Sequence, residues 1–199
     1  PTDVFSGGPT VCAQDPIQNS RSVCIFPRSP IEAPPAGGIG LGSLSNDGVN
    51  WATTGANIFA ALRDGDLTDV VYDNAGVAWI SSRQGLIKYE SGGTSIRLLN
   101  KATHPDLPSE NIRALDTDGS GIALATDQGV VVYRPSVEDQ AMQWQEPTGL
   151  PAALIQSPVV AIAFGADGTL YCGTNDGLYI VSADLVFQKE LSISDGLAS

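Results

Sequence analysis

The sequence contains little of the side-chain chemistry that most enzymes use. One of its 199 residues is histidine and three are cysteine. The histidine, His104, stands in the polar segment Ala102-Thr-His-Pro-Asp, and we interpret it as a structural or solvent-exposed loop residue. No histidine is then left for a serine–histidine–aspartate triad. Acidic pairs are too numerous in this chain to single out a glycosidase pair. The sequence therefore predicts no catalytic residue, no metal site and no cofactor.

Basic residues are also scarce, and long apolar runs are missing. Lysine and arginine total 10 against 22 aspartate and glutamate residues, which gives a formal net charge of −12. A chain of this charge repels phosphate groups, so we expect neither nucleic acid nor anionic membranes as partners. No run approaches the roughly 18 apolar residues of a membrane span, and direct membrane insertion is not expected. We interpret the acidity as that of a solvated surface.

Two of the three cysteines lie in a polar, proline-rich N-terminal segment. A free pair of thiols there would be a liability, whereas a disulfide would hold a segment that has little core of its own. A zinc site would need four ligands, and no histidine or second cysteine pair is near. We therefore predict a disulfide between Cys12 and Cys24, and with it an extracytoplasmic location. Cys172 lies in an apolar stretch, and we expect it to be a buried free thiol.

Glycine and proline are plentiful by comparison, with 22 and 13 residues spread along the chain. This distribution favours many short strands joined by tight turns over a few long helices. Apolar residues make up 42% and charged residues 16%, a balance that is typical of a folded chain rather than a disordered one. The composition thus predicts an all-β fold.

The chain also contains an internal repeat, with copies that begin near residues 47, 74, 118 and 167. Each copy has a first turn, a short strand that ends on a hydroxyl residue, a second turn and another apolar strand. Glycine in the turns supplies a positive φ, the hydroxyl can bond turn backbone, and a large side chain in the strand can pack between sheets. The predicted structural positions are Gly48, Trp51, Thr54, Gly76, Trp79, Ser82, Gly85, Gly119, Thr126, Gly129, Gly168, Tyr171, Thr174 and Gly177, with Asn57 and Ala123 as exceptions.

The spacing of the repeat indicates a β-propeller. The hydroxyl position recurs after 28, 44 and 48 residues, and the two longer intervals suit a four-stranded blade. The 28-residue interval is too short for a fourth strand, so the first blade is expected to be three-stranded or irregular. We predict about four blades of three to four antiparallel strands over residues 39–199, as part of a larger propeller. Residues 1–38 are expected to form an extended proline-rich arm.

Two features of the repeat leave alternatives open. Asp116 and Asp118 stand in an Asp-Thr-Asp-Gly-Ser sequence that has some likeness to a calcium loop, although the rest of such a loop is missing. We favour a turn over a calcium site. The second feature is the aromatic column of Trp51, Trp79 and Tyr171. These side chains could form a sugar-stacking platform, but the repeat places them within sheets, and we favour core packing.

These motifs resemble the two-component-regulator propeller repeat. Its Gly-Leu-Pro-Ser-Asn linker corresponds to Asp106-Leu-Pro-Ser-Glu-Asn-Ile, and its Leu-Trp-Ile-Gly-Thr strand and Asp-Gly-Leu turn to Leu170-Tyr-Cys-Gly-Thr-Asn-Asp-Gly-Leu. The similarity covers roughly residues 40–199. It implies a larger propeller of the bacterial periplasm or cell surface, as in sensor ectodomains of hybrid histidine kinases and in cell-surface secretion factors.

The functional hypotheses follow from the repeat and from the missing catalytic groups. The first is a non-catalytic protein-binding or assembly module of a surface or secreted complex, whose partners are other protein chains or the remainder of a longer chain. The alternatives are a ligand-sensing periplasmic ectodomain of a two-component regulator and, less favoured, a propeller lyase or glycosidase. The ligand and the total number of blades do not follow from the sequence.

Overall fold

The computed structural model describes residues 11–17, 22–25, 41–44, 51–53, 67–90, 96–134, 143–152, 154 and 157–197. These residues form four four-stranded antiparallel sheets in chain order. Sheet 1 contains β1 (Val11–Gln14), β2 (Ser22–Ile25), β3 (Leu41–Leu44) and β4 (Trp51–Thr53); sheet 2 contains β5 (Leu67–Tyr72), β6 (Ala78–Ser82), β7 (Gly85–Tyr89) and β8 (Ile96–Leu99). Sheet 3 contains β9 (Ile112–Thr117), β10 (Ile122–Thr126), β11 (Gly129–Arg134) and β12 (Gln143–Gln145); sheet 4 contains β13 (Val159–Phe164), β14 (Leu170–Thr174), β15 (Leu178–Val181) and β16 (Phe187–Leu191). A 3₁₀ turn at Ile193–Asp195 follows β16.

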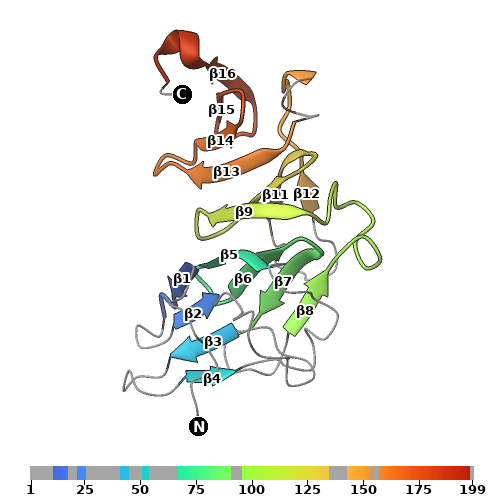
Figure 1. The fold of residues 1–199 in the computed structure, drawn as a ribbon, viewed down its shortest axis with the longest axis vertical. Helices are drawn as coiled ribbons and strands as arrows, with labels where there is room; N and C mark the ends of the chain where they lie inside the picture. The colour runs from blue at the N-terminus through green and yellow to red at the C-terminus, as the bar shows by residue number, and fades with distance from the viewer. Residues whose placement is uncertain are drawn as a thin grey trace, which may run out of the picture.

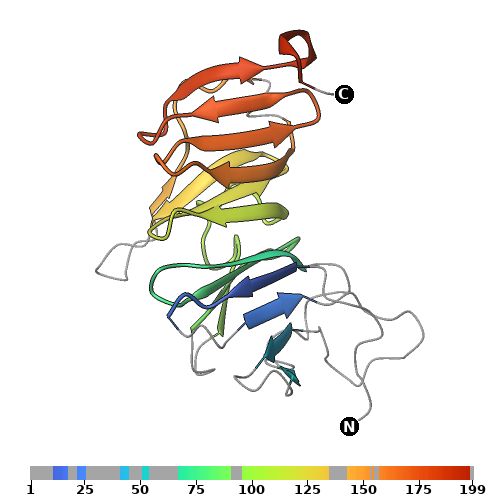
Figure 2. The ribbon, with the colours of Figure 1, turned by 90° about the vertical axis from the view of Figure 1, so that its left-hand side faces the viewer.

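The four sheets are stacked face to face in the order of the chain, with sheet 1 and sheet 4 at opposite ends (Figure 1; Figure 2). The first strand of each sheet contacts the first strand of the next, so that β1, β5, β9 and β13 follow one another along one side of the stack. This arrangement confirms the predicted all-β propeller blades. Among the described residues no strand pairing joins sheet 1 to sheet 4, and the described array is open.

Sheet 1 differs from the prediction in two ways. Its first two strands, β1 and β2, come from residues expected to form an extended arm, and β2 pairs with β3 across the expected boundary at residue 38. The first blade therefore has four strands. Trp51 lies in the fourth strand, where it pairs with Leu44, whereas Trp79 and Tyr171 lie in the second strands of their sheets. The 28-residue interval thus runs from a fourth strand to a second strand, and no strand is missing. Gly48, Thr54 and Asn57 lie outside the described residues.

The hydroxyl residue makes the same kind of hydrogen bonds in the second hairpin of sheets 2, 3 and 4. The Ser82 hydroxyl donates to the carbonyl of Gly85 at 2.8 Å and accepts the amide of Gln84 at 3.1 Å. Thr126 makes the same pair of bonds to Gly129 and Gln128, and Thr174 donates to the Gly177 carbonyl at 3.2 Å. The side chain therefore adds bonds to the turn backbone beside the hairpin's own backbone bond, which the Thr174 amide donates to the Gly177 carbonyl at 2.9 Å in sheet 4.

Glycine is required in these hairpins for two different reasons. In the first turns, Gly76, Gly119 and Gly168 have φ values of 75°, 89° and 82°, a region that L side chains adopt at a cost. In the second turn of sheet 4, Gly177 is needed for space instead, because a Cβ there would lie 2.6 Å from the carbonyl oxygen of Leu191. The prediction of a turn glycine at 177 was based on φ, and the structure replaces that reason with a close approach of two strands.

The hydrophobic core is divided into three layers, one between each pair of neighbouring sheets. The layer between sheets 2 and 3 is built around Trp79, which is 1% exposed and packs with Leu86, Ile122 and Leu124. Its indole Nε1 donates to the carboxylate of Asp73 at 2.8 Å, so the ring has its polar partner within the core. Linker leucines seal two layers: Leu107 between sheets 2 and 3, and Leu154 between sheets 3 and 4.

Candidate functional site

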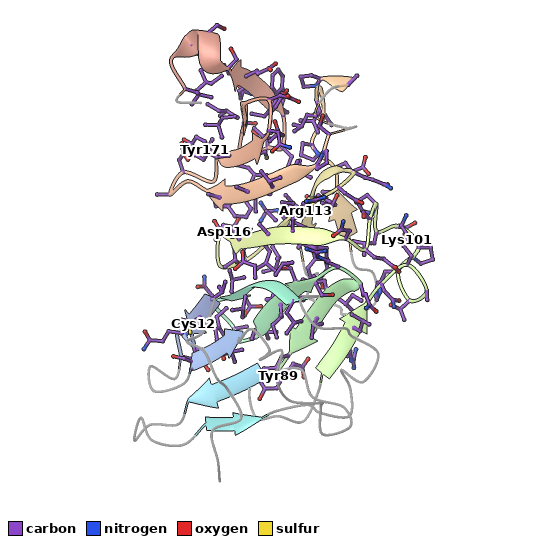
Figure 3. The ribbon with its side chains drawn as sticks, in the orientation of Figure 1. Cys12, Tyr89, Lys101, Arg113, Asp116 and Tyr171 are labelled. Carbon is purple, nitrogen blue, oxygen red and sulfur yellow. The ribbon has the colours of Figure 1, made fainter. Side chains whose placement is uncertain are left out.

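Two carboxylates join the first strands of neighbouring sheets. The Oδ2 of Asp69 in β5 accepts the backbone amide of Leu115 in β9 at 3.2 Å. The Oδ2 of Asp116 in β9, the residue labelled in Figure 3, likewise accepts the amide of Phe164 in β13 at 2.7 Å. These amides lie on the side of their strands that faces away from the second strand of the sheet. Each carboxylate therefore satisfies a backbone donor that the sheet itself leaves unpaired, and it holds the next sheet in place.

The titration of Asp69 reflects this position. Burial is the main cause that raises the pKa of Asp69, and the neighbouring charge of Asp116 acts in the same direction. The backbone amides of Leu115 and Val70, which donate to the carboxylate, oppose the rise. A carboxylate with a raised pKa can serve as a general acid, but both of its oxygens are used here by backbone amides of the sheet junction. We assign Asp69 a structural role.

The first hairpin turns of the sheets lie next to one another. The amide of Asn74, in the turn between β5 and β6, donates to the carbonyl of Gly119, in the turn between β9 and β10, at 3.1 Å. A Cβ on Gly76 would lie 3.1 Å from the side chain of Ile17, which follows β1 and is 62% exposed. These turns thus form a continuous row across sheets 1, 2 and 3, on the side where loops of a propeller can present side chains to a partner.

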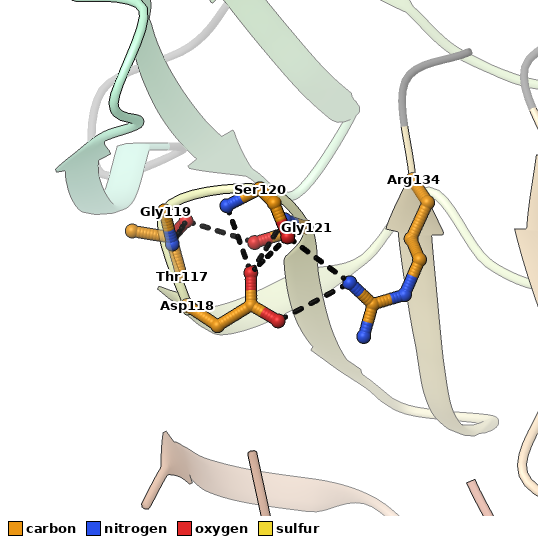
Figure 4. Close-up of polar contacts among 6 residues, drawn as sticks. All are labelled: Thr117, Asp118, Gly119, Ser120, Gly121 and Arg134. Carbon is orange, nitrogen blue, oxygen red and sulfur yellow. Dashed lines mark hydrogen bonds and ion pairs between the residues drawn. The ribbon is translucent and has the colours of Figure 1, made fainter. Parts of the chain in front are cut away.

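Asp118 organises the turn of sheet 3 and is paired with Arg134 (Figure 4). Its Oδ1 accepts the amides of Ser120 and Gly121 at 2.8 and 2.6 Å, and its Oδ2 lies 3.2 Å from Nη1 of Arg134. Partial burial acts to raise the pKa of Asp118, but these donors and the arginine outweigh it, and the pKa lies below its ordinary value. Because Asp116 instead faces Phe164, the two carboxylates serve separate partners. The turn interpretation is favoured over a shared calcium ion.

The aromatic position has a different environment in each sheet. Trp79 is buried. The centroid of its ring lies 5.3 Å from the centroid of the Tyr133 ring and 5.8 Å from the Lys88 ammonium nitrogen. Its faces are therefore not available for a sugar. Trp51 is placed only by its strand, because its side chain lies outside what the structure describes. Tyr171, in contrast, is 36% exposed on the last sheet. The repeat thus leaves one described aromatic at the surface.

The exposed tyrosine belongs to an apolar surface that the sequence analysis did not identify. Along β14 the buried residues Leu170 and Cys172 face sheet 3, so Tyr171 between them faces away. The strand register places Ala163 of β13 and Ile180 of β15 beside it. Ala161 and Leu178 stand in the next row on this face, on either side of Gly173. We name these five residues the open face of sheet 4. The sequence of one strand could not reveal the open face, because the exposure of its side chains depends on whether another sheet packs against it.

The cysteines occupy contrasting environments. The β1–β2 register places Cys12 directly opposite Cys24. Opposite residues in an antiparallel pair have Cα atoms about 4.5 or 5.5 Å apart, and both separations lie within the range of a disulfide. The Cys24 side chain lies outside the described part of the structure, and the bond stays a prediction. Cys172 is a buried free thiol, as predicted, and burial raises its pKa to about 12.

His104 lies in the loop before sheet 3, half-buried, with its Nδ1 2.9 Å from the Thr103 hydroxyl. Burial lowers its pKa. Within the described ranges, no group of three or more histidine, cysteine, aspartate or glutamate side chains is arranged to hold a metal ion. In the same ranges, no helix is long and apolar enough to cross a membrane. We take the open face of sheet 4 as the candidate functional site.

Comparison with known proteins bears on the fold. No protein-family model matches the sequence, and no curated protein matches it. Among solved structures, the chain is similar to the extracellular domain of a hybrid two-component system from B. thetaiotaomicron, with a TM-score of 0.65 and 14% identity. The match covers 96% of this chain and 23% of the other. The chain thus spans about a quarter of that protein's length, and the likeness supports the resemblance drawn from the repeat.

Two further similar structures show how varied the functions on this fold are. YCF48 bound to a D1 peptide has a TM-score of 0.57 at 13% identity, over 96% of this chain and 56% of that one. A gluconolactonase from Xanthomonas campestris has a TM-score of 0.55 at 11% identity, over 91% of this chain and 61% of the enzyme. Identities this low establish the fold alone, so a functional argument must start from the site.

Proposed function

We propose that the chain is a non-catalytic, extracytoplasmic β-propeller module that binds other protein chains. The observation that carries the proposal is the open face of sheet 4. Four large apolar side chains are exposed in the described structure, and three of them belong to the last sheet and its turns: Val160, Tyr171 and Val186. Tyr171 lies in the open face, whereas Val160 lies at the bulge of β13 and Val186 in the turn before β16. Exposed apolar surface gathered on one sheet marks an interaction site more often than scattered single residues do.

The composition of the open face suits a protein partner. Tyrosine is enriched at the centre of protein interfaces, because its ring buries a large area while its hydroxyl can meet a polar group. The five residues of the face include alanine, leucine and isoleucine around Tyr171 and no charged side chain, although the whole chain has a net charge of −12. The row through Tyr171 ends at the edge of the sheet in Lys189 of β16. Charged residues are depleted in the same way at the centres of protein interfaces.

The extracytoplasmic part of the proposal is supported by two observations. Cys12 and Cys24 stand opposite each other in the β1–β2 pair, which is a favourable position for a disulfide in an oxidising compartment. The fold is also shared with an extracellular domain. Protease treatment of intact cells and periplasmic fractionation would test this point, and recovery of the protein in the cytoplasmic fraction would contradict it.

The binding role can be tested with a photo-crosslinking residue placed at position 171 in cells that produce the protein naturally. We expect crosslinks to one or a few defined proteins that share the compartment of this chain. The matched control is the same residue at Asp184, which is exposed in the turn between β15 and β16 outside the open face. Equal crosslinking at both positions, or none at position 171, would contradict the proposal.

A second candidate is a ligand-sensing ectodomain of a two-component regulator. The observation that favours it is the likeness to the extracellular domain of a hybrid two-component system. The two candidates differ in the rest of the gene product, because a sensor must continue into a membrane span and a kinase. Sequencing the gene on both sides of this segment distinguishes them.

A further inference from the structure

The first strands of sheets 2, 3 and 4 share a β-bulge. In each strand one residue has no partner in the second strand of its sheet: Thr68 in β5, Arg113 in β9 and Val160 in β13. The residue before each of them pairs with the hydroxyl residue of its sheet, so the three bulges stand at one place in the repeat. A bulge adds one residue to a strand and redirects its side chain.

The bulge of β9 turns Arg113 out of both core layers. Ile112 and Leu115 lie in the same layer, between sheets 2 and 3, although two residues separate them. A regular strand would place residues at this spacing on opposite faces. Ala114 packs in the layer between sheets 3 and 4, and the extra residue, Arg113, has no place in either layer. Because β9 is an edge strand of sheet 3, Arg113 emerges at its free edge, where it is exposed.

The three bulge residues form a continuous row on neighbouring first strands. The Oγ1 of Thr68 donates to the carbonyl of Ile112 at 2.9 Å, so the first bulge residue contacts the residue just before Arg113. The carboxylate of Asp116, labelled with Arg113 in Figure 3, joins β9 to β13. Arg113 therefore lies between Thr68 on one side and Val160 on the other. We name these three residues the bulge row.

The exposure of Arg113 does not depend on the ends of the described array. Sheet 3 has sheet 2 on one side and sheet 4 on the other (Figure 1). Each neighbour contributes a different side chain to the bulge row. The Thr68 hydroxyl is already used by the Ile112 carbonyl and by the Ser81 hydroxyl at 2.7 Å. Val160 is 40% exposed and offers an apolar surface next to the arginine.

Arg113 has no acidic partner among the described residues. The ion pairs found in the described part of the chain lie on sheet 2 and at the first turn of sheet 3. Asp69 and Asp116, the carboxylates on β5 and β9, accept backbone amides of the next sheets. The guanidinium of Arg113 is therefore accessible to an acidic group from outside the described structure, in a chain whose net charge is −12.

We infer that Arg113 binds the carboxylate of an acidic ligand whose aliphatic part lies on Val160. A guanidinium presents paired N–H donors that match the two oxygens of a carboxylate. Two sources supply this chemistry, a small aliphatic acid and the C-terminus of a peptide, and the test separates them. Neither residue belongs to the open face of sheet 4, so the inference does not rest on the protein-binding role proposed for that face.

The test is a titration of the whole 199-residue chain with defined probes. Isovalerate combines a carboxylate with a branched aliphatic group, and isovaleramide is its neutral counterpart. Inorganic phosphate tests for binding of any anion, and acetylated Gly-Gly-Leu tests for a peptide C-terminus. The readouts are the NMR shifts of the Val160 methyl groups and of the Arg113 side-chain Nε–H.

We expect isovalerate to shift both signals in a saturable way and isovaleramide to shift neither. Arg113→Gln should weaken the binding of isovalerate about tenfold or more, because a charge-assisted hydrogen-bond pair is lost. The matched control is Arg97→Gln, since Arg97 is exposed on β8, the outer strand of sheet 2. This control should leave the affinity unchanged.

Two further variants separate the roles of charge and apolar contact. Arg113→Lys keeps the charge but loses the paired donors, and its affinity should lie between those of the original chain and Arg113→Gln. Val160→Thr keeps the branched shape and should weaken the binding of isovalerate more than that of phosphate. Both positions are exposed, so we expect the thermal midpoints of all variants to stay close to that of the original chain.

Three results would overturn the inference. The first is the absence of a saturable shift at both signals with isovalerate and with the peptide. The second is equal weakening by Arg113→Gln and Arg97→Gln, which would reduce the effect to overall charge. The third is equal affinity for phosphate and isovalerate in both the original and the Val160→Thr chains. Tighter binding of the peptide than of isovalerate supports a peptide C-terminus as the ligand, and the reverse order supports a small acid.

Discussion

Replacement of Thr126 by valine tests the hydrogen-bonding role of the hydroxyl position with little change in shape. Thr126 is fully buried at the end of β10. Its hydroxyl donates to the Gly129 carbonyl at 2.9 Å and accepts the Gln128 amide at 3.1 Å. Valine keeps the branched side chain and removes both bonds. The turn then keeps the backbone pairing of Thr126 with Gly129 and loses the side-chain bonds that add to it.

The expected cost follows from the burial of each group. A hydrogen bond contributes about 0.5–1.5 kcal/mol net, and a buried group left without a partner costs about 1–3 kcal/mol. Gln128 is exposed, so its amide can turn to water, whereas the carbonyl of the buried Gly129 cannot do so easily. We therefore expect Thr126→Val to lower the free energy of unfolding by about 2–3 kcal/mol.

Thr174→Val is the matched control, because Thr174 makes the same turn bonds and is half-buried. Water can replace its hydroxyl, and we expect a loss of about 0.5–1.5 kcal/mol. Both variants are compared with the original chain by urea unfolding at equal slope. The reasoning is refuted if Thr126→Val costs no more than Thr174→Val, because the hydroxyl would then not be a buried turn partner.

Three further predictions concern the strand and sheet junctions. Gly177→Ala places a Cβ 2.6 Å from the Leu191 carbonyl oxygen and should lower the free energy of unfolding by about 1–3 kcal/mol; an unchanged urea midpoint would contradict this. Asp116→Ala removes the acceptor of the Phe164 amide and should cost about 1–3 kcal/mol, with faster hydrogen exchange at that amide as the specific sign. The pKa of Asp118 is lowered in the folded chain, so its stabilisation is present above its ordinary pKa and is lost as the pH falls through the lowered value. Asp118→Asn should remove that part of the pH dependence of stability, and identical profiles for both chains would exclude it.

The hairpins of sheets 2, 3 and 4 could be predicted from the sequence because local chemistry determines them. Gly119 needs a positive φ, and Thr126 supplies the turn bonds within three residues of chain. Both requirements depend on near neighbours in the sequence and recur at a fixed spacing. The same local logic identified Cys172 as a buried residue of an apolar strand.

Sheet 1 could not be placed in this way, because an Asp-Gly turn suits any antiparallel hairpin. The copy that contains Trp51 was aligned with the second strands of the other sheets, and it belongs to the fourth strand of its own. Its actual first two strands, β1 and β2, lack the Gly and aromatic columns of the repeat. They join the sheet because β2 pairs with β3 through its backbone, and no side-chain pattern in the sequence predicts that pairing.

The position of a sheet in the stack decides what its repeated residues do. Trp79, Ala123 and Tyr171 hold one position of the repeat, yet the first two are core residues and the third is on the surface. Asp116 and Ala163 also correspond, and only the carboxylate binds the next sheet. A repeat keeps its internal hairpins wherever it stands, because they depend on local bonds, but its outer face depends on a neighbour. The exposure of Tyr171 therefore follows from the place of sheet 4 in the described array, as the burial of Trp79 and Ala123 follows from the places of sheets 2 and 3.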